Sequence, residues 1–492
     1  MNGLYDKLRE YSASDYYGFH MPGHKRHAPG DVDLPYGIDI TEIEGFDDLH
    51  HAAGILKDAQ ELAAKVYGAD ETGFLVNGST AGILSAILGC TRRGDRILAA
   101  RHCHKSVYHA IDMNGLRPVY LYPDFDENIH MNMEISVSAV KTALMEYSDI
   151  RAAVIVSPTF DGVISDIGEI AAAVHEYGIP LIVDEAHGAH LGFHPYFEEN
   201  ALAKGADVVI QSVHKTLPSL TQTALLHVKG ELAERGRIFR YLDMLQSSSP
   251  SYILMASIDH CIHLLDERPE ELFEPYASRL SALRESLKGL RCLKIIETER
   301  YDYSKLVISV GGSGLTGKDL YGILLSRYHL QMEMAAGTYV IAMTSPGDTP
   351  EGFERLKKAL FEIDDEYAGK VSDSKNQETV EKGEGQPAEE VQKESRSTDG
   401  LWGVPVNEQA MTSREAFEIS DGERASESLF WESAVGRISA EYAYLYPPGS
   451  PLVVPGERIS PEAARLLEKY REAGFRVEGL ETEGQIKVLK LT

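Results

Sequence analysis

Seven short apolar runs between residues 51 and 250 alternate with longer amphipathic stretches. The runs cover residues 73–76, 97–100, 119–122, 153–157, 180–184, 208–211 and 224–228. Apolar residues recur at helical spacing between most of them, as in Ile55–Tyr67, Ala139–Tyr147 and Ile167–Tyr177. Apolar strands that alternate with helices are typical of a mostly parallel sheet with helices on both faces. We therefore expect an α/β protein built on a seven-stranded sheet.

Changes in composition divide the chain into five regions. We predict an N-terminal extended arm (1–50), a large domain (51–250), a smaller α/β domain (251–369), a flexible charged linker (370–400) and a small C-terminal domain (401–492). The linker is rich in Glu, Lys, Ser, Gln and Gly, so it cannot bury enough apolar surface to offset its ordering entropy. In the smaller domain, the apolar runs 305–309 and 339–343 predict two strands.

Charge and cysteine content exclude several classes of function. The 492-residue chain has a formal net charge of −28, which argues against nucleic acid or an anionic membrane as a partner, because phosphates would be repelled. Its four cysteines are scattered and form no CxxC pair, so we expect no disulfide framework, no zinc site and a reducing cytoplasm. We also expect no signal peptide and no membrane-spanning helix, because no sufficiently long apolar stretch occurs.

Two charged residues follow predicted strands of the large domain. Asp184 ends the apolar run 180–184, and Lys215 follows the run 208–211. Ligands bind at the carboxyl ends of strands in open parallel sheets, so both side chains are expected at one sheet edge. A carboxylate there can hold a protonated ring nitrogen, and a partly desolvated lysine can form a Schiff base. The alternatives are a helix-capping aspartate and a solvated loop lysine.

Other polar segments fall at the same edge. Val76–Gly82 leads from a strand into a helix, and its free N–H groups with the Ser79 and Thr80 hydroxyls suit a phosphate, although an ordinary capped turn fits as well. Arg101–Ser106 contains His102 and His104, which could stack on a flat ring, cap a helix or lie at the surface. Metal is not expected there, because the spacing is not that of structural zinc sites. Leu245–Tyr252 is either a phosphate-binding loop or a polar turn.

In combination these motifs resemble the aspartate-aminotransferase-type fold of pyridoxal-phosphate (PLP) enzymes. More narrowly, the chain resembles the bacterial ornithine/lysine/arginine decarboxylase family. The segments that carry the resemblance are His20–His24, Asp39–Glu42, Asp47–His50, Arg101–Ser106, Asp184–Gly188, Ser212–Lys215, Ser247–Tyr252 and Tyr446–Glu457. No segment is similar to the N-terminal wing domain of the family's long members, so a ring-shaped decamer is not expected.

The resemblance implies a role for each candidate residue. Lys215 would hold PLP as a Schiff base, Asp184 would pair with the pyridine nitrogen, and His104 would stack on the ring. Further cofactor contacts would come from Ser79, Thr80, Ser212 and His214 at the phosphate and from Thr159 and His187 beside the ring. Ser247 or Ser248 would reach the phosphate of a partner subunit, which implies a homodimer. The substrate's distal cation would bind Glu441, with Asp47 and Asp48 as weaker candidates.

The reaction that the resemblance implies is α-decarboxylation of lysine, arginine or ornithine, with the pyridinium as electron sink. The amine product and CO2 would leave after Lys215 or His104 reprotonates Cα. An aminotransferase or an aldolase/lyase on the same fold is the alternative enzyme. A non-catalytic PLP-binding protein is the alternative outside enzymes, and the sequence does not choose among the three basic amino acids.

Overall fold

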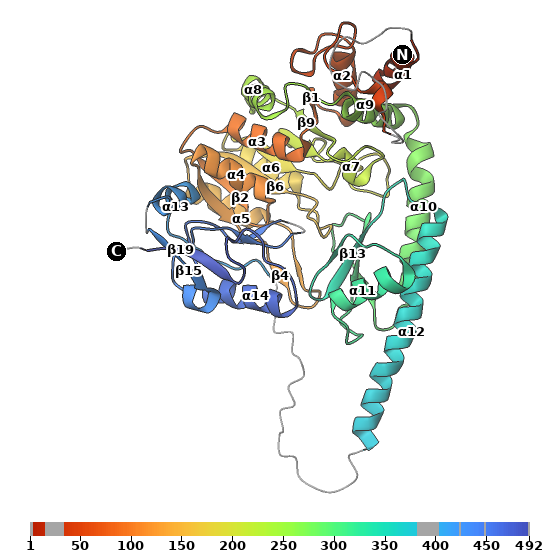
Figure 1. Cartoon of the computed structure of the whole chain (residues 1–492), viewed down its shortest axis with the longest axis vertical. Coiled ribbons are helices and arrows are strands. Elements are labelled where there is room, and N and C mark those ends of the chain that lie inside the picture. Colours follow the sequence, from red (N-terminus) through yellow and green to blue (C-terminus); the bar gives the residue numbers. More distant parts are fainter. Residues whose placement is uncertain (1–2, 15–33, 381–402, 423–424, 447–448, 491–492) are drawn as a thin grey trace.

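The apolar runs of the large domain form one seven-stranded sheet in the computed structural model, which describes residues 3–14, 34–380, 403–422, 425–446 and 449–490 (Figure 1). In spatial order the strands are β1 (Glu71–Leu75), β9 (Ala224–Val228), β8 (Val208–Gln211), β7 (Leu181–Asp184), β6 (Ile150–Val156), β2 (Arg96–Ala100) and β3 (Arg117–Leu121). The pairs from β8 to β3 are parallel, and β9 is antiparallel to both neighbours. The predicted mostly parallel sheet is confirmed.

Helices cover both faces of this sheet. Every residue of β7, β8 and β9 is buried, and alternate side chains of a strand point to opposite faces. The covering helices are α2 (Ile55–Tyr67), α3 (Gly78–Cys90), α4 (Lys105–Asn114), α5 (Val137–Glu146), α6 (Ile167–His175) and α8 (Arg235–Leu245). A short hairpin of β4 (Phe125–Asp126) and β5 (Met131–Asn132) projects from the sheet toward the other domains (Figure 1).

The smaller domain packs a four-stranded antiparallel sheet against helices. The strands, in spatial order, are β10 (Lys294–Ile296), β11 (Lys305–Ser309), β13 (Tyr339–Met343) and β12 (Met334–Ala335). The helices are α10 (Pro269–Leu287), α11 (Gly317–Tyr328) and α12 (Pro350–Val380), whereas the preceding helix α9 (Tyr252–Glu267) packs against α1 (Leu4–Ala13) and α2. Helix α12 extends through residues 370–380, the first part of the predicted linker. Residues 381–400 of the predicted linker lie outside the described residues.

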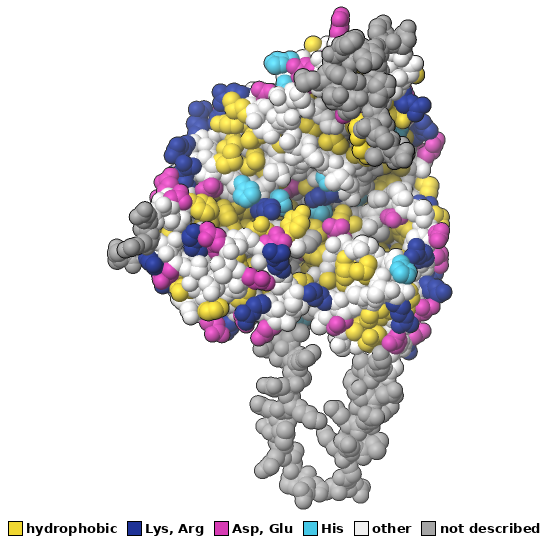
Figure 2. Space-filling model, viewed as in Figure 1, with side chains coloured by type: hydrophobic (Ala, Val, Ile, Leu, Met, Phe, Trp, Pro, Cys, Tyr) yellow, Lys and Arg dark blue, Asp and Glu magenta, His cyan; other side chains and the backbone are white. Residues whose placement is uncertain are grey.

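The C-terminal domain has its own apolar core around Trp431 and Leu467. Its elements are β14 (Glu408–Gln409), α13 (Ser413–Ser420), β15 (Ser426–Phe430), η3 (Trp431–Ala434), β16 (Ala443–Tyr444), β17 (Pro451–Val453), β18 (Glu457–Arg458), α14 (Pro461–Glu472) and β19 (Gln485–Leu489). Figure 2 shows histidine side chains gathered in the hollow between the large domain and the two smaller domains.

The N-terminal region is only partly the extended arm that we predicted. Residues Leu4–Ala13 form helix α1, because Leu4 and Leu8 lie one turn apart on the same face and are fully buried. The backbone N–H of Leu4 donates to Asp259 of α9 at 2.7 Å. Short turns of 3-10 helix follow as η1 (Tyr36–Ile38) and η2 (Leu49–His51). The segment His20–His24 lies outside the described residues.

Across the described part of the chain, no helix combines the length and the hydrophobicity needed to cross a bilayer.

Candidate active site

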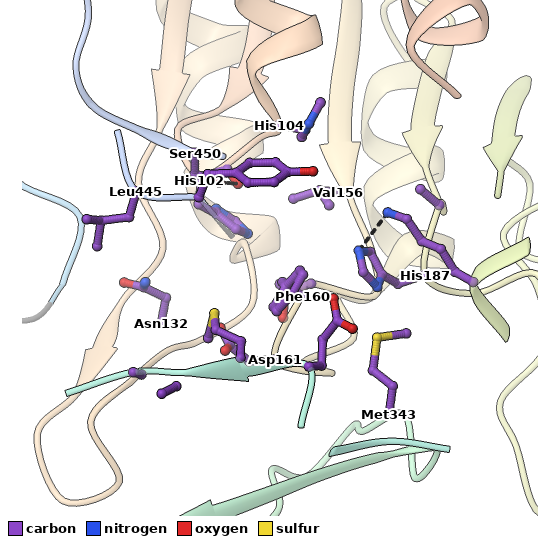
Figure 3. Close-up of a pocket in the computed structure, with 18 of the residues that line it drawn as sticks. His102, His104, Asn132, Val156, Phe160, Asp161, His187, Met343, Leu445 and Ser450 are labelled. Atoms are coloured by element: carbon purple, nitrogen blue, oxygen red, sulfur yellow. Dashed lines mark hydrogen bonds between the residues drawn. The ribbon is translucent and has the colours of Figure 1, made fainter. Parts of the chain in front are cut away.

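A cavity of about 1060 Å³ opens at the carboxyl edge of the parallel strands, where the three domains meet. Figure 3 shows side chains from the large, small and C-terminal domains around it. Nine of the residues predicted from the sequence line it, namely Ser79, Thr80, His104, Thr159, Asp184, His187, Ser212, His214 and Lys215. Parallel strands end at one edge, and this is why segments up to 136 residues apart contribute to one cavity.

Lys215 lies on a single helical turn, α7 (Val213–Thr216), directly after β8. Its Nζ is 3.0 Å from Nε2 of His187, as the dashed line in Figure 3 marks. Burial lowers the pKa of Lys215, the nearby Lys305 lowers it further, and the Asp184 carboxylate opposes both. A lysine with a lowered pKa is more often the uncharged nucleophile that Schiff-base formation requires.

Asp184 ends β7 and is 3% exposed. Burial raises its pKa, whereas Lys215 and the backbone N–H of Ala186 lower it. That N–H is 3.2 Å from Oδ1 and is the hydrogen-bond donor found for this carboxylate among the described residues. A buried carboxylate is stabilised by a cation, so a protonated ring nitrogen fits at this position.

An anion-binding corner faces these two residues. Helix α3 begins at Gly78, which adopts φ +71° and turns the chain so that the first amides of the helix are free. The hydroxyls of Ser79 and Ser212 meet at 2.7 Å, although they come from different strand ends. Free amides and two converging hydroxyls suit a phosphate.

His214 contributes differently from our expectation. Its Nδ1 is 2.7 Å from the backbone carbonyl oxygen of Thr223, which can only accept, so Nδ1 carries the proton. Burial lowers the pKa of His214, which favours the neutral ring. Neutral His214 therefore has no proton on Nε2 to donate to a phosphate. In this form its hydrogen bond to Thr223 stabilises the loop that precedes β9.

The two histidines after β2 have distinct environments. His104 caps α4, accepting from the Ser106 N–H at its Nδ1, and burial with the nearby Lys215 lowers its pKa to about 4. His102 was left without a role by the sequence, yet both its ring nitrogens are buried without a partner in the described structure, and the residue lines the cavity. Burial lowers the pKa of His102 to about 4, so both rings are neutral near pH 7.

A buried ionic cluster behind His187 was not predicted. Lys305 is fully buried and donates to Asp302 at 2.8 Å, while its Nζ is 3.4 Å from the backbone oxygen of His187. Asp302 also contacts Nε2 of His190 at 2.9 Å. Through Lys305, the cluster connects the start of β11 in the small domain to the turn that carries His187. In the sequence, the one sign of this cluster is that a lysine, Lys305, begins an apolar strand.

The structure does not bring the other candidates into the cavity. Both carboxylate oxygens of Glu441 accept backbone N–H groups, from Glu481 and Lys487 at 2.9 and 2.8 Å, inside the C-terminal domain. Asp47 accepts the amides of Ala53, Gly54 and Leu56 ahead of α2, and Asp48 caps η2. The carboxylates of these three residues therefore accept hydrogen bonds from backbone N–H groups, and none of the three lines the cavity.

Ser247 and Ser248 are exposed beside the anion-binding corner. The Ser247 N–H donates to Asn77 at 3.2 Å, and its carbonyl oxygen is 2.8 Å from Nε2 of His50. Their contact with a partner subunit stays a prediction.

The C-terminal domain is joined to the site by its Tyr446–Glu457 segment. Glu457 accepts from the Arg101 guanidinium at 3.0 Å, and both side chains are almost fully buried. Gly449 accepts from the Lys105 N–H at 3.1 Å, and a Cβ at Gly449 would lie 3.4 Å from the His104 ring. The segments Arg101–Ser106 and Tyr446–Glu457, which lie about 350 residues apart in the sequence, therefore form one wall of the cavity.

Two family models match the chain. Residues 2–303 match the Orn/Lys/Arg decarboxylase major domain, and residues 400–486 match the C-terminal domain of the same family. Among relatives, the uncharacterized protein YaaO of Bacillus subtilis is 35% identical, covering 97% of this chain and 95% of the relative. The arginine decarboxylase of Bacillus subtilis is 33% identical, covering 99% and 97%. The constitutive lysine decarboxylase of Escherichia coli is 24% identical, covering 91% and 72%.

Solved structures support the fold. The lysine decarboxylase LdcF of Francisella novicida superposes with a TM-score of 0.79 at 19% identity, covering 99% of this chain and 81% of that chain. A structure of SPT with a PLP internal aldimine superposes with a TM-score of 0.50 at 18% identity, covering 63% and 76%. The sheet, the cavity at its carboxyl edge and both family matches agree: the chain belongs to the Orn/Lys/Arg decarboxylase family and is a decarboxylase of basic amino acids.

Proposed function

We propose that the protein removes the α-carboxylate of arginine in a PLP-dependent reaction. The observation that carries the proposal is the placement of Lys215 between a buried carboxylate, Asp184, and an anion-binding corner, Ser79 with Ser212, in one cavity. PLP carries an aldehyde between a ring nitrogen and a phosphate, so its groups correspond to these three positions. The choice among basic amino acids rests on a separate argument.

The residues of the cavity fit PLP. Burial raises the pKa of Asp184, so a pyridinium nitrogen would supply the cation that this carboxylate lacks. The free amides of α3, with Ser79, Thr80 and Ser212, would hold the phosphate. Nδ1 of His187 is buried without a partner in the described structure, and the ring lies against Lys215, where the cofactor's substituents would reach it.

When bound, PLP supplies a sink for the electron pair left by departing CO2. Lys215, with its lowered pKa, exchanges with the substrate amine and can return a proton to Cα. Neutral His187 accepts a hydrogen bond from Lys215 Nζ and fixes its direction. Neutral His104 can lie on the ring face without adding positive charge there.

Arginine is favoured over lysine by the relatives. The relative named arginine decarboxylase is 33% identical over 99% of this chain, against 24% over 91% for the one named lysine decarboxylase. We also propose that the protein acts as a homodimer, with the exposed Ser247 and Ser248 beside the anion-binding corner in contact with the partner.

The test is product analysis of the purified protein supplied with PLP. Equal concentrations of arginine, lysine and ornithine are offered separately, and CO2 and amine are measured. We expect CO2 and agmatine, which is decarboxylated arginine, with the other two substrates much slower. Consumption of a keto acid without release of CO2 from any of the three would overturn the proposal. Sedimentation at micromolar concentration tests the dimer.

A further inference from the structure

Asp161 is an acidic side chain of the cavity that has no assigned role. It follows β6 in the turn Thr159–Gly162 and lines the cavity. Burial raises its pKa, and hydrogen bonds from the Tyr339 hydroxyl and from its own amide lower it. Tyr339 donates to Oδ1 at 2.7 Å. No lysine, arginine or histidine of the described residues forms an ion pair with this carboxylate, so the half-buried Asp161 has no counter-ion among them.

The turn that carries Asp161 is rigid. The Gly162 N–H donates to the Thr159 carbonyl at 3.0 Å, and the Tyr301 hydroxyl donates to the Asp161 carbonyl at 2.9 Å. Gly162 has φ +98°, and a Cβ there would lie 2.9 Å from the Tyr301 ring. Two tyrosines of the small domain thus fix the backbone and the carboxylate of Asp161 before any ligand enters, which reduces the ordering cost of binding.

Asp161 and the Schiff-base lysine line the same cavity, and no hydrogen bond or ion pair of the described residues joins them. Figure 3 shows Asp161 with Asn132 on one side and His187, the neighbour of Lys215, on the other. A group that binds the far end of a substrate joined at Lys215 must line the cavity without contacting that lysine.

Two further polar side chains line the same cavity. His102 lines it with two buried nitrogens that have no partner in the described structure, and the neutral ring presents one of them as an acceptor. Asn132 also lines it, with its Oδ1 accepting the Val404 N–H at 3.3 Å. A planar cation with several N–H donors can use a carboxylate and a neutral imidazole together, whereas an ammonium is a compact point charge.

We propose that Asp161 binds the distal guanidinium of the substrate, with His102 as a second acceptor, and so selects basic amino acids. This inference deepens the proposed function and rests on it. The cation enters as the counter-ion that the carboxylate lacks, and the hydrogen bond from the Tyr339 hydroxyl occupies Oδ1 and leaves Oδ2 for the ligand. Besides Asp184, which already has a role, two other carboxylates line the cavity, Glu333 and Glu478, but Glu333 is exposed and acts on Lys215.

The decisive variant is Asp161→Asn, which keeps the shape and can still accept from Tyr339. Arginine is compared with citrulline, in which a neutral urea replaces the guanidinium. We expect kcat/KM for arginine to fall about 100-fold or more, mainly through KM, because one partner of a buried charge pair is removed. Activity on citrulline should not fall with it, so the arginine-to-citrulline preference collapses. An equal loss on both substrates would overturn the proposal as a merely structural effect.

Glu333→Gln and Glu478→Gln are the matched controls, because each removes one carboxylate of the same cavity. We expect both to retain the preference for arginine over citrulline. If either control loses that preference while Asp161→Asn keeps it, the assignment is wrong. His102→Ala should weaken arginine binding by a smaller factor than Asp161→Asn.

Agmatine binding, measured by calorimetry on the PLP-loaded protein, separates this proposal from the proposed function. We expect the wild type and Glu333→Gln to bind agmatine and Asp161→Asn to lose that binding. A wild type that binds agmatine through Asp161 but releases no CO2 from arginine would refute the proposed function and leave this inference standing. A wild type that decarboxylates arginine while Asp161→Asn binds agmatine normally would refute the inference alone.

Discussion

The buried pair Arg101–Glu457 should decide whether the C-terminal domain stays attached to the wall of the active site. The two side chains are 0% and 2% exposed, and the guanidinium also donates to the carbonyl oxygens of Pro451 and Leu452. Glu457→Gln keeps the volume but leaves Arg101 charged and buried without its counter-ion. Breaking a buried pair from one side costs about 3–5 kcal/mol. The retained carbonyl contacts place the expected loss near the lower value, about 3 kcal/mol.

Glu408→Gln is the matched control. Its carboxylate contacts Arg458 at 3.0 Å, the distance found for Glu457 and Arg101, but these side chains are 67% and 41% exposed. An exposed pair contributes about 1 kcal/mol or less. The chain has two tryptophans, Trp402 and Trp431, both in the C-terminal region, so tryptophan fluorescence during urea unfolding reports on that region alone.

We expect the urea midpoint to fall clearly for Glu457→Gln and hardly at all for Glu408→Gln. We also expect kcat to fall for Glu457→Gln, because Arg101 precedes His102 and His104 in the wall. Equal, small shifts of the midpoint in the two variants would refute the view that burial makes the Arg101–Glu457 pair essential. The double variant Arg101→Met with Glu457→Leu should lose less stability than the two single losses added together, since no charge is left unpaired.

Three further predictions concern the site and its supports. Lys215→Ala should abolish both turnover and the visible absorbance of the PLP-loaded protein without unfolding it, and retention of both would refute the Schiff-base assignment. Ser212→Ala should raise the Kd for PLP by about 10–100-fold, the value of a hydrogen bond to a charged group, whereas Ser136→Ala, which removes only a helix cap, should leave it unchanged when PLP is titrated. Burial raises the pKa of Glu185 from 4.5 to about 8, so the unfolded chain loses this proton at lower pH than the folded one. The wild type should therefore lose stability relative to Glu185→Gln as the pH rises from about 5 to 8, and melting curves that keep a constant gap across that range would contradict this.

The sheet was predictable because burial on both faces makes strands uniformly apolar. The predicted run 224–228 coincides with β9, and the predicted helix 55–67 coincides with α2. The direction of β9 was not predictable, because an apolar run contains no information on whether its neighbours are parallel. Helix α1 was missed since only Leu4 and Leu8 mark its buried face, and their partners on α9 lie about 250 residues away.

The residues of the candidate site also fall into those that the sequence could predict and those that depend on tertiary contacts. Residues at strand ends, such as Asp184 and Lys215, were found because parallel strands bring their carboxyl ends to one edge whatever the loops do. Glu441 was proposed as the cation-binding acid, but the amides that occupy its carboxylate come from residues 40 and 46 positions later, a pairing that only the folded C-terminal domain creates. Asp161 is the converse case. The sequence prediction reached Thr159, two residues away, but gave Asp161 no role, because its significance arises only when the small domain supplies Tyr339 and no cation of the described residues. A carboxylate that folding partly buries without a counter-ion is a cost to the empty protein, and a cationic substrate offsets that cost only when it is bound.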